Sequence, residues 1–413
     1  MPTINRWRVL TGAVLILFCT GAIYAFSVWV GPLAGAHEWT PAQVVLGFTI
    51  NGAIAPIPMI LGGFFVDRGW TRYSVGVGAV LFAAGFALAG TASSLGMYYF
   101  WYGIVAGLGM GFAYSGCLNN TIKLFPDRKG FASGVLTAAL GTGTVVAAPV
   151  AQAIIKSAGP DAAYVRMGLA YLPIVIIGAF LIKTAPVGFV PEGWTPPAGA
   201  PAVVNKTWQQ MLGTPTFYLI FAMLGAGAFS GLMIGSQLSP IAQTDMFAIS
   251  AATAAVLVSV YAICNAVGRF AWGAISDRIG YINSVIVIYV VVALSFVVLL
   301  TMNSMPGFVI GIIGLGLAFG GVMGVFPALS MNTFGPRFQG VNYGIIFSGY
   351  AIAAYFGPKV GASLGGGAKG DYTQPFIIAI VVAAVGVALA LTTRVVLAKA
   401  KVEAPAAPAG VNA

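Results

Sequence analysis

Long apolar runs separated by short polar segments make up almost the whole chain. An α-helix needs about 20 apolar residues to cross the hydrocarbon core of a bilayer. Such runs predict helices, because a helix satisfies its backbone polar groups within the segment. The pattern therefore predicts twelve transmembrane helices, at approximately residues 8–33, 41–65, 73–93, 97–122, 130–156, 163–186, 215–240, 248–275, 281–301, 306–332, 340–364 and 373–397.

One long connection interrupts this series after the sixth run. Residues 187–214 are rich in proline and glycine, which favour loops over helices. We therefore expect an N-terminal six-helix bundle over residues 1–186, a linker over 187–214 and a C-terminal six-helix bundle over 215–397. Residues 398–413 include an Ala- and Pro-rich stretch and are expected to form a disordered tail.

Short motifs recur in the two expected bundles. A Gly-x-x-x-Asp-Arg segment ends the second run at Asp67-Arg68 and recurs after the eighth run at Asp277-Arg278, with Asp277 210 residues after Asp67. The segment resembles the conserved loop motif of the major facilitator superfamily. Transporters with repeated halves alternate access to a central site between the halves. The Asp–Arg pairs are accordingly expected to lock one conformation against a neighbouring helix.

Composition supports an integral membrane protein. Hydrophobic residues make up 59% of the chain and charged residues 7%, whereas soluble domains carry about 25% charged residues. The three cysteines lie in apolar runs without ligand spacing, and the single histidine, His37, lies in an expected loop. No cofactor or metal site is predicted. The spans hold no nucleophile with a base or acid/base pair, so the sequence does not favour an enzyme.

The distribution of basic residues predicts the orientation. With both termini in the cytoplasm, fourteen Lys and Arg residues fall on the cytoplasmic side and four on the other side, which agrees with the positive-inside rule. The linker and tail would then also be cytoplasmic. The net charge of +10 indicates topology and contact with anionic membrane lipid rather than nucleic-acid binding. We expect a multi-pass protein of a prokaryotic inner membrane, acting as a monomer.

Arg269 is the most informative residue for function. It lies eight residues before Asp277, so about 12 Å of helix separates it from the cytoplasmic end. Arginine at such depth is costly and usually functional. No Asp or Glu falls inside any of the twelve runs, so an anion from outside, such as a carboxylate, is the best partner for its planar guanidinium.

Other polar and aromatic residues fall in spans expected to line the central cavity. Asn265 lies one helical turn before Arg269 and shares its face. Each such residue alone more often bonds one helix to another than contacts a ligand. The remaining candidates are Tyr24, Asn51, Tyr114, Asn119, Asn120, Tyr343 and Tyr350, with Phe319, Phe326 and Phe347 as possible apolar walls.

Four motifs resemble the bacterial oxalate:formate antiporter family, which is related to the monocarboxylate transporters that move lactate and pyruvate with protons. They are Gly21-Ala-Ile-Tyr24-Ala-Phe-Ser27, Phe125-Pro-Asp-Arg-Lys-Gly-Phe-Ala-Ser-Gly134, Met211-Leu-Gly-Thr-Pro-Thr-Phe217 and Asn342-Tyr-Gly344. The similarity extends over essentially the whole chain.

The resemblance implies roles for individual residues. Arg269 matches the arginine that engages the substrate carboxylate, Tyr24 and Tyr114 match cavity tyrosines, and Phe319 matches an aromatic wall residue. Two positions depart from the pattern. Tyr350 stands where the oxalate site has a lysine, which favours a singly charged substrate. Asn265 stands where animal proton-coupled carriers have an acidic residue, which puts coupling through that residue in doubt.

The sequence thus predicts a secondary transporter of small monocarboxylates such as lactate or pyruvate, with protons as the expected coupling ion. An exchanger of the oxalate:formate type is the first alternative, because it needs no proton. A non-transporting membrane sensor is a remote alternative. The expected substrate-binding residues are Arg269, Asn265, Tyr24, Tyr114, Tyr350, Asn119, Asn120, Phe319 and Asn51, and the expected gating residues are Asp67, Arg68, Asp277 and Arg278.

Overall fold

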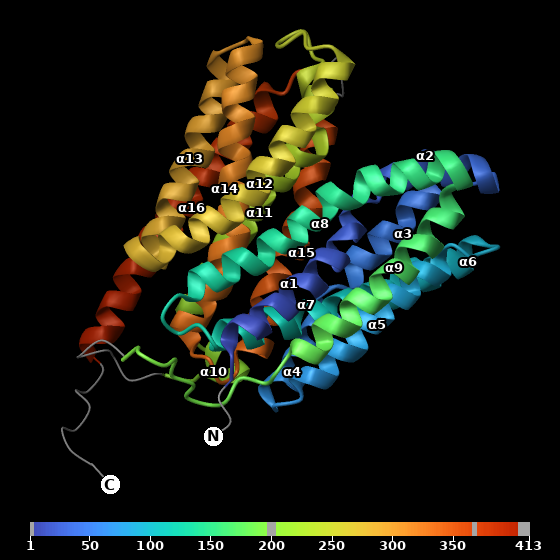
Figure 1. The fold of residues 1–413 in the computed structure, drawn as a ribbon. Coiled ribbons are helices and arrows are strands. Elements are labelled where there is room, and N and C mark those ends of the chain that lie inside the picture. Colours follow the sequence, from blue (N-terminus) through green and yellow to red (C-terminus); the bar gives the residue numbers. More distant parts are fainter. Residues whose placement is uncertain (1–3, 196–203, 366–369, 404–413) are drawn as a thin grey trace.

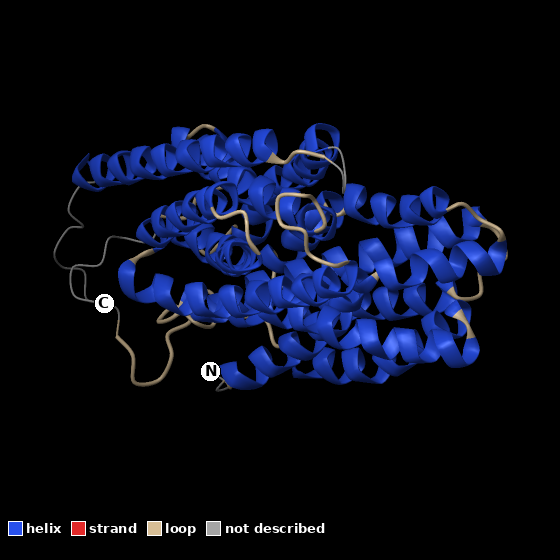
Figure 2. Ribbon diagram, turned by 90° about the horizontal axis from the view of Figure 1, so that it is seen from above, coloured by secondary structure: helices blue, strands red, loops and turns tan. Residues whose placement is uncertain are grey.

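The computed structural model describes residues 4–195, 204–365 and 370–403, and these residues form helices and loops without a strand (Figure 2). The first half of the chain holds α1 (Arg6–Thr20), η1 (Gly21–Ala25), α2 (Ser27–His37), α3 (Pro41–Ile54), α4 (Pro56–Asp67), α5 (Thr71–Ala89), α6 (Leu95–Tyr98), η2 (Tyr99–Val105), α7 (Ala106–Lys123), α8 (Lys129–Ala158) and α9 (Pro160–Leu181).

The second half begins after the linker. Its elements are the short α10 (Trp208–Leu212) and then α11 (Pro215–Ala242), α12 (Ala251–Ile279), α13 (Tyr281–Thr301), α14 (Met305–Phe334), α15 (Gln339–Gly365) and α16 (Thr373–Glu403).

Helices occupy all twelve ranges predicted from hydropathy. Ten of the described helices or helix pairs are long and apolar enough to cross a membrane. The two others are the α6–η2–α7 segment and α15. Both are rich in glycine and carry tyrosine and polar residues, which lower their mean hydropathy.

Three of the predicted spans are not continuous α-helices. In the first span a 3₁₀ segment, η1, separates α1 from α2. Gly21 begins it, and a Cβ there would lie 2.0 Å from the carbonyl oxygen of Leu140, so only glycine permits this approach to α8. In the second span Pro56 separates α3 from α4, since proline lacks the N–H that a helix interior needs. The fourth span contains the π-helical η2.

The helices gather into two bundles, one for each half of the chain (Figure 1). The start of α1 and the end of α16 lie at the same end of the molecule, here called the terminal end, and the opposite end is called the distal end (Figure 1). The halves come together at the terminal end and diverge toward the distal end (Figure 1).

The boundaries differ from the predicted ones near the C-terminus and in the linker. Helix α16 continues past residue 397 to Glu403, and the remainder of the expected tail, residues 404–413, lies outside the described residues. The end of the linker packs on the second half, where the N–H of Lys206 donates to the carbonyl of Phe334 and the Asn342 amide donates to the carbonyl of Lys206.

Candidate functional site

Two helix crossings join the halves at the terminal end, and each is capped by an acidic residue of the repeated motif. The Asp67 carboxylate at the end of α4 accepts the N–H groups of Gly340 and Val341 at 3.1 and 3.0 Å. The Asp277 carboxylate near the end of α12 accepts the N–H groups of Gly130 and Phe131, both at 2.8 Å. Each acid therefore caps the N-terminus of a helix in the opposite half, where the helix dipole favours negative charge.

Glycines bring the backbones into contact at both crossings. A Cβ on Gly63 would lie 2.2 Å from the carbonyl carbon of Gly340, and a Cβ on Gly273 would lie 2.4 Å from the carbonyl oxygen of Gly130. No real side chain fits at such distances. The glycine of each Gly-x-x-x-Asp-Arg motif is thus what allows its acid to reach the opposite helix.

The arginines of the motif do not take part in this closure. Arg68 lies over the ring of Phe64, 3.9 Å from its centroid, and the cation that pairs with Asp67 is instead Lys123, at 2.9 Å. Arg278 is exposed and makes no ion pair among the described residues. The structure therefore assigns the cross-half contacts to the two aspartates and to helix N-terminal N–H groups, rather than to Asp–Arg pairs.

Arg269 lies on α12, two turns toward the distal end from Asp277. Its Nε–H donates to Oδ1 of Asn265 at 2.9 Å, and Nη1 donates to the carbonyl oxygen of Thr137 on α8 at 2.9 Å. In the part of the chain that the structure describes, no carboxylate pairs with it. Because a guanidinium has five N–H donors, three remain for a ligand.

Tyrosines from both halves surround this guanidinium. Tyr24, Tyr114 and Tyr350 all lie close enough to Arg269 to interact with it electrostatically. Tyr24 follows the break at Gly21 and is 42% exposed. Among the described residues, the hydroxyls of Tyr24 and Tyr350 have no hydrogen-bond partner in the protein, whereas buried Tyr261 donates to the carbonyl of Gly231 at 2.9 Å.

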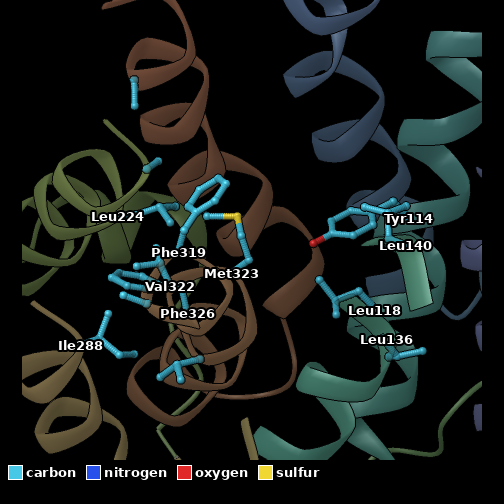
Figure 3. Packing of buried hydrophobic residues seen from close by; sticks show 14 of the residues in the cluster. Tyr114, Leu118, Leu136, Leu140, Leu224, Ile288, Phe319, Val322, Met323 and Phe326 are labelled. Atoms are coloured by element: carbon cyan, nitrogen blue, oxygen red, sulfur yellow. The ribbon is translucent and has the colours of Figure 1, made fainter. Parts of the chain in front are cut away.

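An aromatic face lies beside these hydroxyls. The rings of Phe347 and Tyr350 on α15 stack with their centroids 4.8 Å apart, and Tyr114 lies 6.2 Å from Phe347 across the interface. Figure 3 shows the Tyr114 hydroxyl pointing from α7 toward α14, where Phe319 and Met323 lie. The site therefore combines one cation, phenol hydroxyls and an apolar wall.

Phe319 packs mainly within the second half. Its ring lies where a Cβ on Gly231 of α11 would be, at 2.2 Å, and 9% of the residue is exposed. It lies beside Met323 of the same helix (Figure 3).

Three candidate asparagines bond within the first half. The Asn51 amide donates to the carbonyl of Tyr102, and the Asn119 amide donates to the carbonyl of Ser115. Asn120 donates to the carbonyl of Lys183 and accepts from Thr71 and Ala185. The three are buried. The Asn51 and Asn120 contacts join segments of one bundle, whereas the Asn119 contact lies within α7. The three residues are therefore left out of the site proposed below.

One contributor had no signal in the sequence. The Thr137 carbonyl is a backbone group, so residue type does not reveal it. Phe347 was expected as a possible apolar wall, and its stacking on Tyr350 and its position opposite Tyr114 agree with that expectation.

The fold and this site define a class. Two helical bundles are joined at one end by repeated motifs, and between them lies an arginine that has no carboxylate partner among the described residues. These are features of a membrane transporter with pseudo-symmetric halves. The model of the Major Facilitator Superfamily matches residues 10–358 and 227–413. The chain belongs to that superfamily.

Relatives within the superfamily agree with the resemblance in the sequence motifs. The oxalate:formate antiporter of Oxalobacter formigenes is 28% identical over 366 residues, covering 87% of this chain and 85% of the antiporter. Monocarboxylate transporter 12 of Homo sapiens is 22% identical over 401 residues, covering 90% and 77% of the two chains. Both have carboxylates or carboxylic acids in their names.

A solved structure confirms the fold. The fucose:proton symporter of E. coli superimposes with a TM-score of 0.67 at 14% identity, covering 95% of this chain and 99% of the symporter. The predicted all-α membrane architecture of two six-helix bundles is thereby confirmed. The protein is a multi-pass membrane transporter.

Proposed function

We propose that the protein transports small monocarboxylates, such as lactate or pyruvate, and that the substrate carboxylate binds Arg269. The observation that carries this proposal is the guanidinium itself, which lies between the halves with three free N–H donors and no carboxylate partner among the described residues. A planar carboxylate matches its fork geometry. The names of the relatives support the same ligand chemistry.

The surroundings of Arg269 support a singly charged substrate. Groups that interact electrostatically with the guanidinium include the neutral phenols of Tyr24, Tyr114 and Tyr350. Their hydroxyls can donate to a carboxylate or to a neighbouring oxygen, and the Phe347–Tyr350 stack offers contact to a short carbon chain. A second carboxylate would have to be desolvated beside these rings without a cation, which is costly.

The positive-inside count supports a cytoplasmic terminal end. The closed terminal end would then face the cytoplasm, and the open distal end would face the outside. In this conformation a carboxylate reaches Arg269 from outside, and separation of the two crossings would release it inward.

Protons are the proposed coupling ion, and exchange is the alternative. The exchange alternative is favoured by one observation: the residue beside Arg269 is the amide Asn265 rather than an acid. Symport predicts uptake driven by an inward proton gradient. Exchange predicts uptake driven by counter-substrate inside the vesicle and unchanged by that gradient.

Uptake of labelled pyruvate into proteoliposomes tests the proposal. Arg269→Gln is expected to lower uptake at least a hundredfold, because a charge-assisted bidentate contact is removed. Arg394→Gln is the matched control, because Arg394 lies exposed on α16 of the same half and makes no ion pair among the described residues. Uptake by Arg269→Gln at the control rate would overturn the assignment of the site.

A binding screen separates the substrate classes. Lactate, pyruvate, acetate, oxalate and malonate are compared by thermal shift on the purified protein. Stabilisation by monocarboxylates and not by dicarboxylates is the expected result. Tighter binding of oxalate than of pyruvate would favour the exchanger.

A further inference from the structure

Arg269 makes a contact that a binding site alone does not require, because it reaches across the interface between the halves. Its α12 belongs to the second half, and the Thr137 carbonyl that accepts from Nη1 belongs to α8 of the first half. The hydrogen-bond length is 2.9 Å. Without substrate, the residue that is expected to bind the substrate therefore also forms a hydrogen bond between the two bundles.

The α8–α12 crossing is fastened at two places. Toward the terminal end, Asp277 accepts from Gly130 and Phe131. Eight residues along α12, about 12 Å nearer the distal end, Arg269 donates to Thr137. Between these points the backbones touch, since a Cβ on Gly134 would lie 2.6 Å from the carbonyl oxygen of Arg269.

The α4–α15 crossing is fastened only at its terminal end. Subtracting the repeat offset of 210 places Met59 at the position that corresponds to Arg269, and adding it places Phe347 opposite, at the position of Thr137. Neither side chain can make the equivalent hydrogen bond. The second fastening is thus specific to the crossing that contains the arginine.

We propose that Arg269 is a latch: without substrate it holds α8 against α12 and keeps the terminal end closed, and the substrate carboxylate releases it. The proposal rests on the proposed function, because it takes a carboxylate as the ligand of Arg269. A carboxylate is a stronger acceptor for a guanidinium than a carbonyl, and the Thr137 carbonyl already accepts a helical N–H in the continuous α8. Binding therefore withdraws the guanidinium from Thr137.

Asn265 keeps the guanidinium of Arg269 in position while its partner changes from the Thr137 carbonyl to the substrate carboxylate. Its Oδ1 must face Arg269, because the guanidinium Nε–H can only donate. This contact lies within α12 and holds the Nε side of the guanidinium while the Nη groups change partners. The substrate thus occupies the site and at the same time removes the hydrogen bond that holds the α8–α12 crossing. A ligand that binds the open state better shifts the equilibrium toward that state.

The distance between the halves at the terminal end shows whether the latch is closed or open. Spin labels are placed at Tyr73 and Asn283, both exposed at the starts of α5 and α13 and 210 residues apart in the repeat. The native cysteines, Cys19, Cys117 and Cys264, are first replaced by alanine. Pulsed dipolar spectroscopy then gives the populations of the closed and open terminal end without any transport assay.

Without substrate, Arg269→Gln is expected to raise the ratio of open to closed molecules about tenfold, because a hydrogen bond from a charged donor is lost. Arg394→Gln is expected to keep the wild-type distribution. Saturating pyruvate is expected to shift the wild-type protein in the same direction as Arg269→Gln does and to leave Arg269→Gln itself unchanged. A wild-type distribution for substrate-free Arg269→Gln would overturn the latch.

The two proposals fail separately. If Arg269→Gln loses pyruvate binding but keeps the closed distribution, the latch is wrong and the binding site stands. If it opens the terminal end and still binds pyruvate, the binding site is wrong. Should Arg269→Gln not fold, Arg269→Lys keeps the charge but cannot hold Asn265 and Thr137 together, and wild-type opening by pyruvate remains as an independent measurement that overturns the latch if it is absent.

Discussion

Single residues at the centre of this transporter have unequal roles. Arg269 contacts both halves, whereas Asn51 and Asn120 bond within one half although their residue types suggest cavity positions. Tyr350 stands beside the site with a free hydroxyl among the described residues. In the proposed site, one cation and the neutral residue at position 350 would set the charge of the substrate.

Tyr350→Lys is expected to change the preference of the site from monocarboxylates to dicarboxylates. A second cation near Arg269 would neutralise a second carboxylate, so the affinity for oxalate should rise at least tenfold relative to that for pyruvate. Isothermal titration of both ligands measures the ratio. Tyr350→Met, similar in length and neutral, is the control. An unchanged ratio in the lysine variant would show that position 350 does not contact the substrate.

At the scale of elements, close helix crossings require glycine, and an ion pair holds the start of α1 against the loop between α7 and α8. The α8–α12 and α4–α15 crossings bring backbones together at Gly130, Gly273, Gly63 and Gly340. Arg6, the first residue of α1, pairs with Asp127 in the loop between α7 and α8, and Arg128 pairs with the same carboxylate.

Gly273→Ala is expected to prevent full closure of the terminal end. The new Cβ would meet the carbonyl oxygen of Gly130 and the Cα of Gly134 at 2.4 and 2.9 Å, and backbone cannot yield as a flexible side chain does. Pyruvate uptake should fall about tenfold or more, and the labels at Tyr73 and Asn283 should report longer distances. Gly31→Ala is the control, because a Cβ there meets nothing within 4 Å. Equal uptake by the two variants would contradict the crossing's dependence on close contact.

The Arg6–Asp127 contact predicts a dependence of stability on pH. Burial raises the pKa of Asp127, but hydrogen bonds from Arg6 and Arg128 outweigh it and hold the pKa below its ordinary value. The contribution to stability is therefore present above the unfolded pKa of about 3.9 and is lost as the pH falls through the folded value.

Asp127→Asn should lower the free energy of unfolding by about 1 kcal/mol at pH 7. The difference from wild type should shrink as the pH falls below about 3.9 and vanish once the folded carboxyl group is protonated. Thermal unfolding in detergent at several pH values measures it, with the exposed Asp245→Asn as control. A constant difference down to pH 3 would assign the effect to packing rather than to charge.

At the scale of the molecule, the two halves are held together at the terminal end by two related crossings, α4–α15 and α8–α12. Asp67 and Asp277 occupy equivalent positions and accept from equivalent helix N-termini, Gly340 with Val341 and Gly130 with Phe131. The closures are not identical, because Lys123 supports Asp67, whereas Tyr281 donates to Asp277.

Loss of both acids is expected to open the terminal end more than loss of either one. Each aspartate accepts one backbone N–H group at each of its two carboxylate oxygens. Asp67→Asn and Asp277→Asn each leave a single oxygen that can accept, so the open fraction should rise several-fold for each variant. The double variant should show roughly the product of the two effects, because the crossings share no residues. The Tyr73–Asn283 label distance measures all three, and a double variant no more open than Asp277→Asn would show that α4–α15 does not hold the halves.

The sequence predicted the helices well and the site in part. Hydropathy locates membrane spans because lipid imposes one requirement on every segment, and even the polar α7 and α15 were placed. Arg269 stood out because charge at mid-depth is rare. Periodicity does not say whether a polar residue faces its own bundle or the other one, which is why Asn51, Asn119 and Asn120 were grouped with Asn265. The Thr137 carbonyl has no residue-type signature.

The lone guanidinium of Arg269 also has an electrical consequence. Because no carboxylate pairs with Arg269 among the described residues, the proposed site carries one positive charge when it is empty and is neutralised when a monocarboxylate binds. Membrane voltage acts on a charge with about 2.3 kcal/mol per 100 mV, so a voltage that is negative inside would oppose the outward return of the empty site and leave the loaded step nearly unaffected. The rate of net uptake would then depend on voltage through the empty carrier, whereas one-for-one exchange, in which the site never crosses empty, would be almost insensitive to voltage.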